Sequence, residues 1–328
     1  MENNLNGKMV GGKVIIALAL ALGLVGSTSG LQAAFSEKSA GTRAGQFLKL
    51  PVGAKAIGMG EASTALTDDV NSIYYNVAGL ARLEKKNAEY MYSGIFLKNK
   101  AAGDSNPGYH WVGYAMPISE TIGSAGIGLQ YFTAGDINET DIRAAKVGTF
   151  NPTDMAVNLA YARKVADIPL GLNLKIINSK IKESATTVAV DLGAQYTKLM
   201  DSKLNLGFAV QNLGGKLKYE TESDKLPVML RLGSGYKPME NWTAGLDFIL
   251  PEDSDPILGL GTDYMHKINE DASISGRLGY NSRNRKVDGF NGITIGVGFG
   301  FRMATLDYVY SPAGDLASTH RFSLGVKF

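Results

Sequence analysis

In one stretch after another between residues 87 and 328, bulky apolar residues alternate with small or polar ones. The stretch 319–328 shows the pattern in full, because its apolar residues fall on one side of a predicted strand and the others on the opposite side. Such a strand must still pair its backbone groups, and a closed barrel pairs all of them without leaving an exposed edge. The recurring pattern therefore predicts an all-β fold, an antiparallel β-barrel.

The composition of the second face indicates what surrounds the barrel. A soluble β-protein exposes a face rich in Lys, Glu and Thr, whereas this face carries mainly Gly, Ala, Ser, Asn and Gln. Long apolar side chains against lipid and small ones crowded inside a tube are typical of a transmembrane barrel. The sequence thus favours a membrane barrel over the alternative, a secreted soluble β-protein.

The spacing of the alternating segments sets the expected number of strands. Residues 87–328, divided by about 17 residues for each strand and turn, give about fourteen transmembrane strands. An even number is expected because it brings both ends of the sheet to the same rim. The irregular segment 98–153 leaves twelve and sixteen strands as alternatives.

The N-terminus has the features of a secretory signal peptide. Lys8 and Lys13 precede a short apolar run, and small residues follow up to Ala33 and Ala34. The run is shorter than the ~20 residues that span a bilayer, which argues against a membrane anchor. We expect residues 1–34 to be removed, 35–86 to form an N-terminal hatch or plug, and 87–328 to form a barrel in the outer membrane of a diderm bacterium.

Composition and motifs argue against several other classes of protein. A net charge of +2 gives no electrostatic footprint for nucleic acid, and the absence of cysteine excludes disulfides and thiolate metal sites. His110, His266 and His320 are far apart in the sequence, and no phosphate-binding loop or nucleophile elbow is present. We predict no cofactor and no enzyme, although a barrel lipase that assembles Ser, His and Asn from separate strands would show no such motif.

Charged residues on the small-residue face are expected to point into the lumen, since Arg or Lys facing lipid at the bilayer midplane costs about 2–4 kcal/mol. Seven such residues lie on the late strands: Arg231, Asp247, Asp263, Arg277, Arg302, Asp307 and Arg321. Two alternatives are open for them. Either some pair across strands and narrow the lumen, or each is hydrated independently.

Residues 40–86 lack the alternation and form a distinct segment. Thr67 or Asp68 is placed to cap a short helix that runs to Tyr75. Gly58 and Gly60 suit a tight turn or a close approach of two backbones. A small, partly helical element ahead of a barrel fits either a plug inside the lumen or a cap on its periplasmic side.

Motifs in this segment resemble those of the PorV/PorQ family of outer-membrane barrels. They are the run AKAIGMGEA at 54–62, the acidic pair at 68–69 and the run YNVAGL at 75–80, with further similarity at 208–214, 226–233 and 306–328. The motif residues of the hatch are Gly58, Gly60, Asn76, Ala78, Gly79 and Leu80. The chain is more distantly similar to the FadL-type long-chain fatty acid transporters.

This resemblance implies a barrel of about fourteen strands whose N-terminal segment enters the lumen as a hatch. It also implies that Phe328 is the terminal signal read by the barrel-assembly machinery. In the family pattern proline usually follows the asparagine of the hatch motif, and here Val77 follows Asn76. We expect this difference to loosen the turn modestly, because proline would fix φ near its helical value.

Three functions fit these features. The main expectation is a passive channel for hydrophobic or small amphipathic molecules, because a channel does not require long extracellular loops. Its path would be lined by apolar hatch residues, which would otherwise simply pack the hatch against the wall: Phe47, Leu48, Ile57, Met59, Ile73, Tyr74 and Tyr75.

The second function, implied by the resemblance, is a PorV-like shuttle or anchor of type IX secretion that grips exported proteins with extracellular loops. The longest candidate loops, 98–109 and 135–152, are moderate in length for that role. The third is a structural barrel with a closed lumen. The expected partners are membrane lipid, the barrel-assembly machinery, and either hydrophobic small molecules or secreted proteins.

Overall fold

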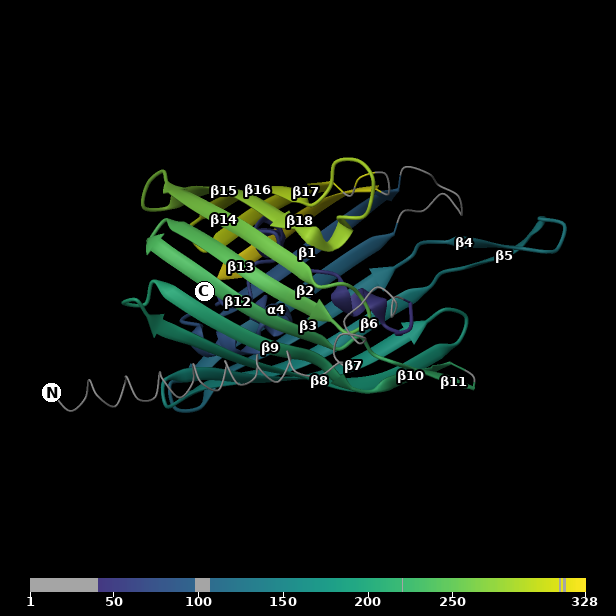
Figure 1. Cartoon of the computed structure of the whole chain (residues 1–328), viewed down its shortest axis with the longest axis horizontal. Coiled ribbons are helices and arrows are strands. Elements are labelled where there is room, and N and C mark those ends of the chain that lie inside the picture. Colours follow the sequence, from purple (N-terminus) through teal and green to yellow (C-terminus); the bar gives the residue numbers. More distant parts are fainter. Residues whose placement is uncertain (1–40, 98–106, 220, 313, 315–316) are drawn as a thin grey trace.

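The computed structural model describes residues 41–97, 107–219, 221–312, 314 and 317–328. Fourteen antiparallel strands close into a barrel (Figure 1). In chain order they are β1 (Asn87–Leu97), β2 (Gly108–Ser119), β3 (Gly123–Thr133), β6 (Thr153–Val165), β7 (Ile168–Lys180), β8 (Ser184–Leu199), β9 (Leu204–Gly214), β12 (Met229–Met239), β13 (Trp242–Pro251), β14 (Ile257–Lys267), β15 (Ala272–Asn281), β16 (Ile293–Phe301), β17 (Ala304–Pro312) and β18 (Ala317–Lys327).

The C-terminal strand closes the ring. Each barrel strand pairs with the next one along the chain, and β18 pairs back onto β1, with Asn87 opposite Lys327 and Leu97 opposite Ala317. The edge that the alternating C-terminus would otherwise expose is therefore covered by the first strand. The predicted closed barrel of fourteen strands is confirmed.

The two faces of the strands divide as the alternation predicts. On β7, Leu170, Leu172 and Leu174 are 40%, 48% and 40% exposed on the outer surface. Asn173 and Lys175 between and beside them are 0% and 1% exposed, because they point into the barrel. Bulky apolar side chains thus form the outer wall, and small or polar ones face inward.

The two ends of the barrel differ in their connections. One end has tight turns, such as the two residues between β6 and β7, and the other has longer segments. Two of the longer segments contain hairpins, β4 (Ile137–Thr140) with β5 (Lys146–Phe150) and β10 (Lys216–Tyr219) with β11 (Glu222–Lys225). Outer-membrane barrels have short periplasmic turns and longer extracellular loops, so we assign the hairpin end to the extracellular side.

The expected loop at 135–152 is therefore largely a hairpin, and β4–β5 projects well beyond the barrel (Figure 1). Most of the other expected loop, 98–109, lies outside the described residues. One further short helix, η4 (Ser282–Asn284), lies in the extracellular connection between β15 and β16. Among the described helices, none combines the length and the apolar character needed to cross a membrane.

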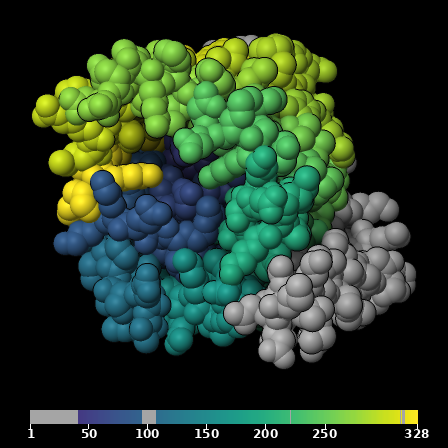
Figure 2. All heavy atoms as spheres, turned by 90° about the vertical axis from the view of Figure 1, so that its left-hand side faces the viewer, coloured from purple at the N-terminus to yellow at the C-terminus, as the bar shows by residue number. Residues whose placement is uncertain are grey.

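Within residues 41–86, four short helical elements precede the barrel: η2 (Gln46–Lys49), α3 (Ala54–Gly58), α4 (Ser72–Tyr75) and η3 (Val77–Arg82). They lie inside the ring of strands, where the purple and blue N-terminal residues occupy the centre of the end-on view (Figure 2). The position is that of a plug and not of an external cap. The expected signal peptide, residues 1–34, lies outside the described residues.

The helix that ends at Tyr75 starts later than expected. Its first residue is Ser72, and no side chain caps it. Asp69 Oδ1 instead accepts a hydrogen bond from Asn71 N (2.9 Å), which forms a turn ahead of the helix. The expected cap at Thr67 or Asp68 is therefore wrong, since the polar residues of this stretch stabilise the preceding turn.

Candidate functional site

The hatch, described from residue 41 to residue 86, runs through the lumen from the extracellular end to the periplasmic end. At the extracellular end, Arg43 and Lys49 pair with Glu252 (2.8 Å) and Asp253 (3.0 Å) in the connection between β13 and β14. At the periplasmic end, Lys86 and Phe328 exchange two backbone hydrogen bonds of 3.0 Å. The hatch is therefore held at both rims. That Phe328 is also an assembly signal stays a prediction.

The hatch backbone touches the barrel wall directly. A Cβ atom on Gly279 of β15 would collide with Gly60 N, and one on Gly261 of β14 would collide with Met59 O. Gly60 has a left-handed φ of 64°, and a Cβ there would collide with Tyr280 O. Small residues on the inner face of the strands are thus required where two backbones meet.

All seven hatch residues predicted to line an apolar path are buried. Their exposed fractions lie between 0% and 3%: Phe47, Leu48, Ile57, Met59, Ile73, Tyr74 and Tyr75. Phe47 and Leu48 belong to an apolar cluster with Ile177 of β7 and Leu217 of β10. Ile57, Ile73, Tyr74 and Tyr75 belong to another with Trp111 of β2. In this conformation these side chains fill the space between hatch and wall.

Asn76 fixes the second half of the hatch. Its Oδ1 accepts a hydrogen bond from Ala78 N (3.2 Å) and so caps η3, while its Nδ2 donates to Thr64 O (2.8 Å) and to Ala194 O of β8 (3.0 Å). A Cβ on Gly79 would collide with Thr67 O. All six motif residues are buried: Gly58, Gly60, Asn76, Ala78, Gly79 and Leu80. The motif therefore encodes the packing of the hatch.

A buried ion-pair network joins the hatch to two strands. Arg231 of β12 is 0% exposed and lies 3.4 Å from Glu61 Oε2 of the hatch and 3.7 Å from Asp247 Oδ2 of β13. Asp247 Oδ2 also accepts hydrogen bonds from the backbone N (3.0 Å) and the hydroxyl (2.5 Å) of Thr64. Buried charges are tolerated when they are paired and hydrogen-bonded, so this network fixes the position of the hatch.

Two tyrosines pack beside this network. The guanidinium of Arg231 lies 5.1 Å from the ring centre of Tyr75 and 5.7 Å from that of Tyr74. The Tyr75 hydroxyl donates to Val52 O (2.8 Å). Burial raises the pKa of Tyr74 to about 12 and that of Tyr75 well above its ordinary value. Both rings therefore remain neutral, and their faces are available to the arginine.

A second group of lumen charges lies on the late strands. Arg277 of β15 pairs with Asp263 of the neighbouring β14 (3.2 Å) and with Asp307 of β17 (2.5 Å), two strands away. All three side chains are at least 87% buried, with exposed fractions of 5%, 13% and 10%. These residues pair across strands, which is the first of the two alternatives for the lumen charges.

The remaining two predicted lumen charges behave differently. Arg321 of β18 reaches the lumen but forms no ion pair with a described residue. The prediction is wrong for Arg302, which lies in the turn between β16 and β17 with its side chain 66% exposed. Its partner is Asp271 of another periplasmic turn (3.5 Å). The alternation predicts the wrong orientation for the Arg302 side chain because the strand already ends at Phe301.

Several charged residues of the lumen were not predicted from the sequence, among them Lys175, Asp191 and Arg283. Lys175 of β7 and Asp191 of β8 form a buried ion pair of 2.8 Å, and Lys175 also donates to Asn212 Oδ1 (2.7 Å). Their position on the inward face of alternating strands was the signal that could have found them. Arg283 of η4, which lies 2.9 Å from Glu61, had no such signal because its segment is irregular.

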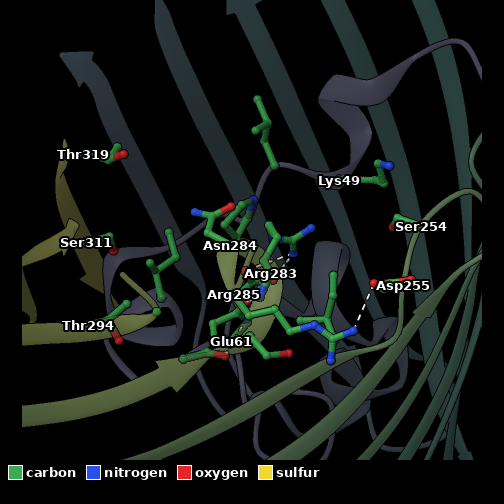
Figure 3. Close-up of a pocket in the computed structure, with 18 of the residues that line it drawn as sticks. Lys49, Glu61, Ser254, Asp255, Arg283, Asn284, Arg285, Thr294, Ser311 and Thr319 are labelled. Carbon is green, nitrogen blue, oxygen red and sulfur yellow. Dashed lines mark hydrogen bonds and ion pairs between the residues drawn. The ribbon is translucent and has the colours of Figure 1, made fainter. Parts of the chain in front are cut away.

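Two cavities lie on opposite sides of α3. The outer cavity, of about 520 Å³, opens between the hatch, η4 and the connection before β14 (Figure 3). The inner cavity, of about 60 Å³, lies among Lys55, Asp68 and Lys237. Ile57 lines the outer cavity and Met59 the inner one, and no described residue lines both. The hatch thus separates the two ends of the lumen.

Two of the described histidines lie beside tyrosines of the barrel wall. His110 and His320 lie among tyrosines, with Tyr90 Oη 3.0 Å from His110 Nδ1 and Tyr308 Oη 2.8 Å from His320 Nδ1. Within the described ranges no cluster of three or more His, Asp or Glu side chains is placed to hold a metal ion.

The sequence matches the family model of the type IX secretion system protein PorV over residues 33–255. The chain belongs to the PorV family. No curated protein sequence matches it. As a PorV-family barrel, it is a protein of the outer membrane of a diderm bacterium.

Solved structures similar to this PorV-family barrel include two toluene transporters and a FadL homologue. The toluene transporter TodX of Pseudomonas putida is 12% identical, with a TM-score of 0.58 over 84% of this chain and 97% of TodX. The toluene transporter TbuX of Ralstonia pickettii is also 12% identical, with a TM-score of 0.59 over 84% of this chain and 98% of TbuX. A FadL homologue of Pseudomonas aeruginosa is 12% identical, with a TM-score of 0.53 over 81% of this chain and 95% of the homologue. At these identities the likeness concerns the fold alone.

Proposed function

We propose that this chain is a docking protein of type IX secretion, which holds exported proteins at the extracellular end of a barrel filled by its own hatch. The observation that carries the proposal is the match to the PorV family over residues 33–255. Docking on the surface thus takes precedence over the passive channel that the sequence alone favoured. The families that the chain resembles are outer-membrane proteins without enzymatic activity.

The extracellular hairpins supply a surface that suits this role. β4–β5 projects beyond the barrel (Figure 1), and its apolar residues Ile142 and Val147 are 102% and 63% exposed. Apolar side chains on an exposed projection favour contact with another protein, since they gain most from being covered. We therefore place the first contact with an exported protein at this hairpin.

A passive channel is the second candidate function. Its support is the fold shared with the toluene transporters TodX and TbuX. The path residues of the hatch are buried against the wall, so transport would require the hatch to move. The purely structural barrel of closed lumen remains the simplest reading of the same packing, and it predicts neither transport nor captured proteins.

The proposal is tested by cross-linking in a host that secretes through a type IX system. An affinity-tagged barrel is cross-linked in living cells and purified, and the bound proteins are identified by mass spectrometry. We expect secreted proteins to be captured, and a chain in which residues 138–147 are replaced by a short Gly-Ser turn to capture several-fold less.

The control replaces residues 268–270 of a periplasmic turn with Gly and Ser, and it should leave capture unchanged. Both variants are first shown to reach the outer membrane as folded barrels. Capture of no secreted protein by the wild type, or equal capture by the hairpin variant, would contradict docking at this surface.

A further inference from the structure

The outer cavity carries an excess of positive charge. Five cationic side chains line it, from the hatch, from η4 and the residues after it, and from β18: Lys49, Arg283, Arg285, Lys286 and Arg321. Only two carboxylates, those of Glu61 and Asp255, line it with them. Labelled side chains from the hatch, the loops and the strands surround one open space (Figure 3).

Four of the five cations have carboxylate partners. Lys49 lies 3.0 Å from Asp253, and Arg283 lies 2.9 Å from Glu61. Arg285 and Lys286 share Asp255, at 3.0 Å and 2.9 Å. Glu61 also pairs with Arg231 (3.4 Å), which does not line the cavity. Among the described residues, no carboxylate is left for the fifth cation, Arg321.

Arg321 lies on the cavity wall, and one of its donors has no partner. It lies on β18, opposite Ser93 of β1 and Val309 of β17, and its Nε is shielded from solvent without a hydrogen-bond partner. A guanidinium presents a planar fork of N–H donors that matches a carboxylate or a phosphate with two parallel hydrogen bonds. Water satisfies such donors but supplies no counter-charge, and Glu61, the carboxylate that acts on Arg321 electrostatically, already pairs with Arg283 and Arg231.

We infer that the outer cavity binds a small organic anion whose carboxylate or phosphate group pairs with Arg321. The cavity volume of about 520 Å³ lies within the roughly 300–1,000 Å³ typical of small-molecule sites. Leu50, Ile57 and Pro312 line the same space and offer an apolar surface to the rest of the ligand. The cavity opens at the extracellular end, so the ligand arrives from outside the cell.

Calorimetry on the intact barrel in a maltoside detergent tests this site. Benzoate is the carboxylate probe, phenyl phosphate the phosphate probe, and benzamide a neutral molecule of nearly the same shape as benzoate. We expect at least one anion to bind, and benzamide to bind at least tenfold more weakly than benzoate if the site prefers carboxylate. Stronger binding of phenyl phosphate would assign the site to phosphate esters.

Two arginine variants locate the binding. Arg321→Gln should weaken the preferred anion at least tenfold, and Arg321→Lys should restore part of the affinity. Arg302→Gln removes the same charge from a periplasmic turn and should leave the affinity unchanged.

Three results would overturn the inference: no binding of either anion, benzamide binding as tightly as both anions, or equal affinity in the Arg321→Gln barrel. The comparison of charged and neutral probes needs only the wild type, so it holds even if a variant fails to fold.

Discussion

At the scale of single residues, the buried charges give the most specific part of the account. Arg231 lies between Glu61 of the hatch and Asp247 of the wall, and its side chain is fully buried. A buried pair need not add much stability as a whole, because both charges lose their hydration. Removing Arg231 is different, since Asp247 is left without a cation and Glu61 keeps only Arg283.

We therefore predict that Arg231→Met lowers the free energy of unfolding by about 3–5 kcal/mol, because Glu61 and Asp247 would be left without their shared cation. Urea unfolding of the barrel refolded into lipid vesicles measures this change. Arg302→Met is the matched control and should cost no more than about 1 kcal/mol, as its ion pair with Asp271 is exposed. Equal losses in the two variants would refute a network that fixes the hatch.

A substitution at Val77 is expected to stabilise the barrel, in contrast to the loss expected for Arg231→Met. Val77 is the first residue of η3, its backbone N donates no hydrogen bond to another described residue, and Asn76 before it is extended (φ −163°, ψ 102°). Proline tolerates these conditions and restricts the unfolded chain. Val77→Pro should raise the free energy of unfolding by about 0.4–1 kcal/mol in the same urea assay. A destabilised variant would show that the side chain of Val77, which packs near Gly171, contributes more than the turn.

At the scale of elements, the glycines of the wall permit the hatch to pack. On β15, Gly279 touches the hatch backbone, whereas a Cβ on Gly276 would meet nothing within 4 Å. The two positions lie in the same strand and differ in what they face. They form a matched pair for testing whether the hatch seat depends on small residues.

Gly279→Ala should destabilise the barrel by about 1–3 kcal/mol, because the added methyl group overpacks the contact with Gly60. It should also expose hatch residues 46–83 to limited proteolysis. Gly276→Ala should change neither the unfolding free energy nor the cleavage pattern. If both variants resist proteolysis equally, the close contact between hatch and wall is not what holds the hatch.

The elements also show what the sequence could and could not predict. The strands were predictable because lipid lies on one side and the lumen on the other, which gives every second residue the same environment. The hatch was not predictable in detail, because neighbours such as Tyr74 and Tyr75 are both buried and leave no period to read. Arg302 was misassigned because the alternation stops one residue earlier, at Phe301.

The candidate site was predictable only in part for a related reason. The alternation predicts that Arg231 and Arg277 point inward, and the sequence pattern alone is sufficient for this prediction. Their partners depend on which strands are neighbours and on where the hatch runs, so the pairing of Arg231 with Glu61 follows from the closed fold. The cavity beside Arg321 has the same origin, since hatch, loops and strand meet there only after closure.

At the scale of the whole molecule, the barrel and the hatch form a closed structure whose extracellular end is the more elaborate one. The hatch is anchored at both rims, packs backbone to backbone with the wall, and separates the outer cavity from the inner one. A molecule that crossed this barrel would have to displace it. We therefore propose that function lies at the extracellular surface and in the outer cavity.

The most direct test of this central claim is the conductance of the purified wild-type barrel in a planar lipid bilayer at neutral pH. A general porin in the same membrane serves as the positive control. We expect no steady ionic current through the wild type, because the hatch fills the lumen. Stable, repeated single-channel steps of uniform size would contradict it and would favour a channel whose hatch is open.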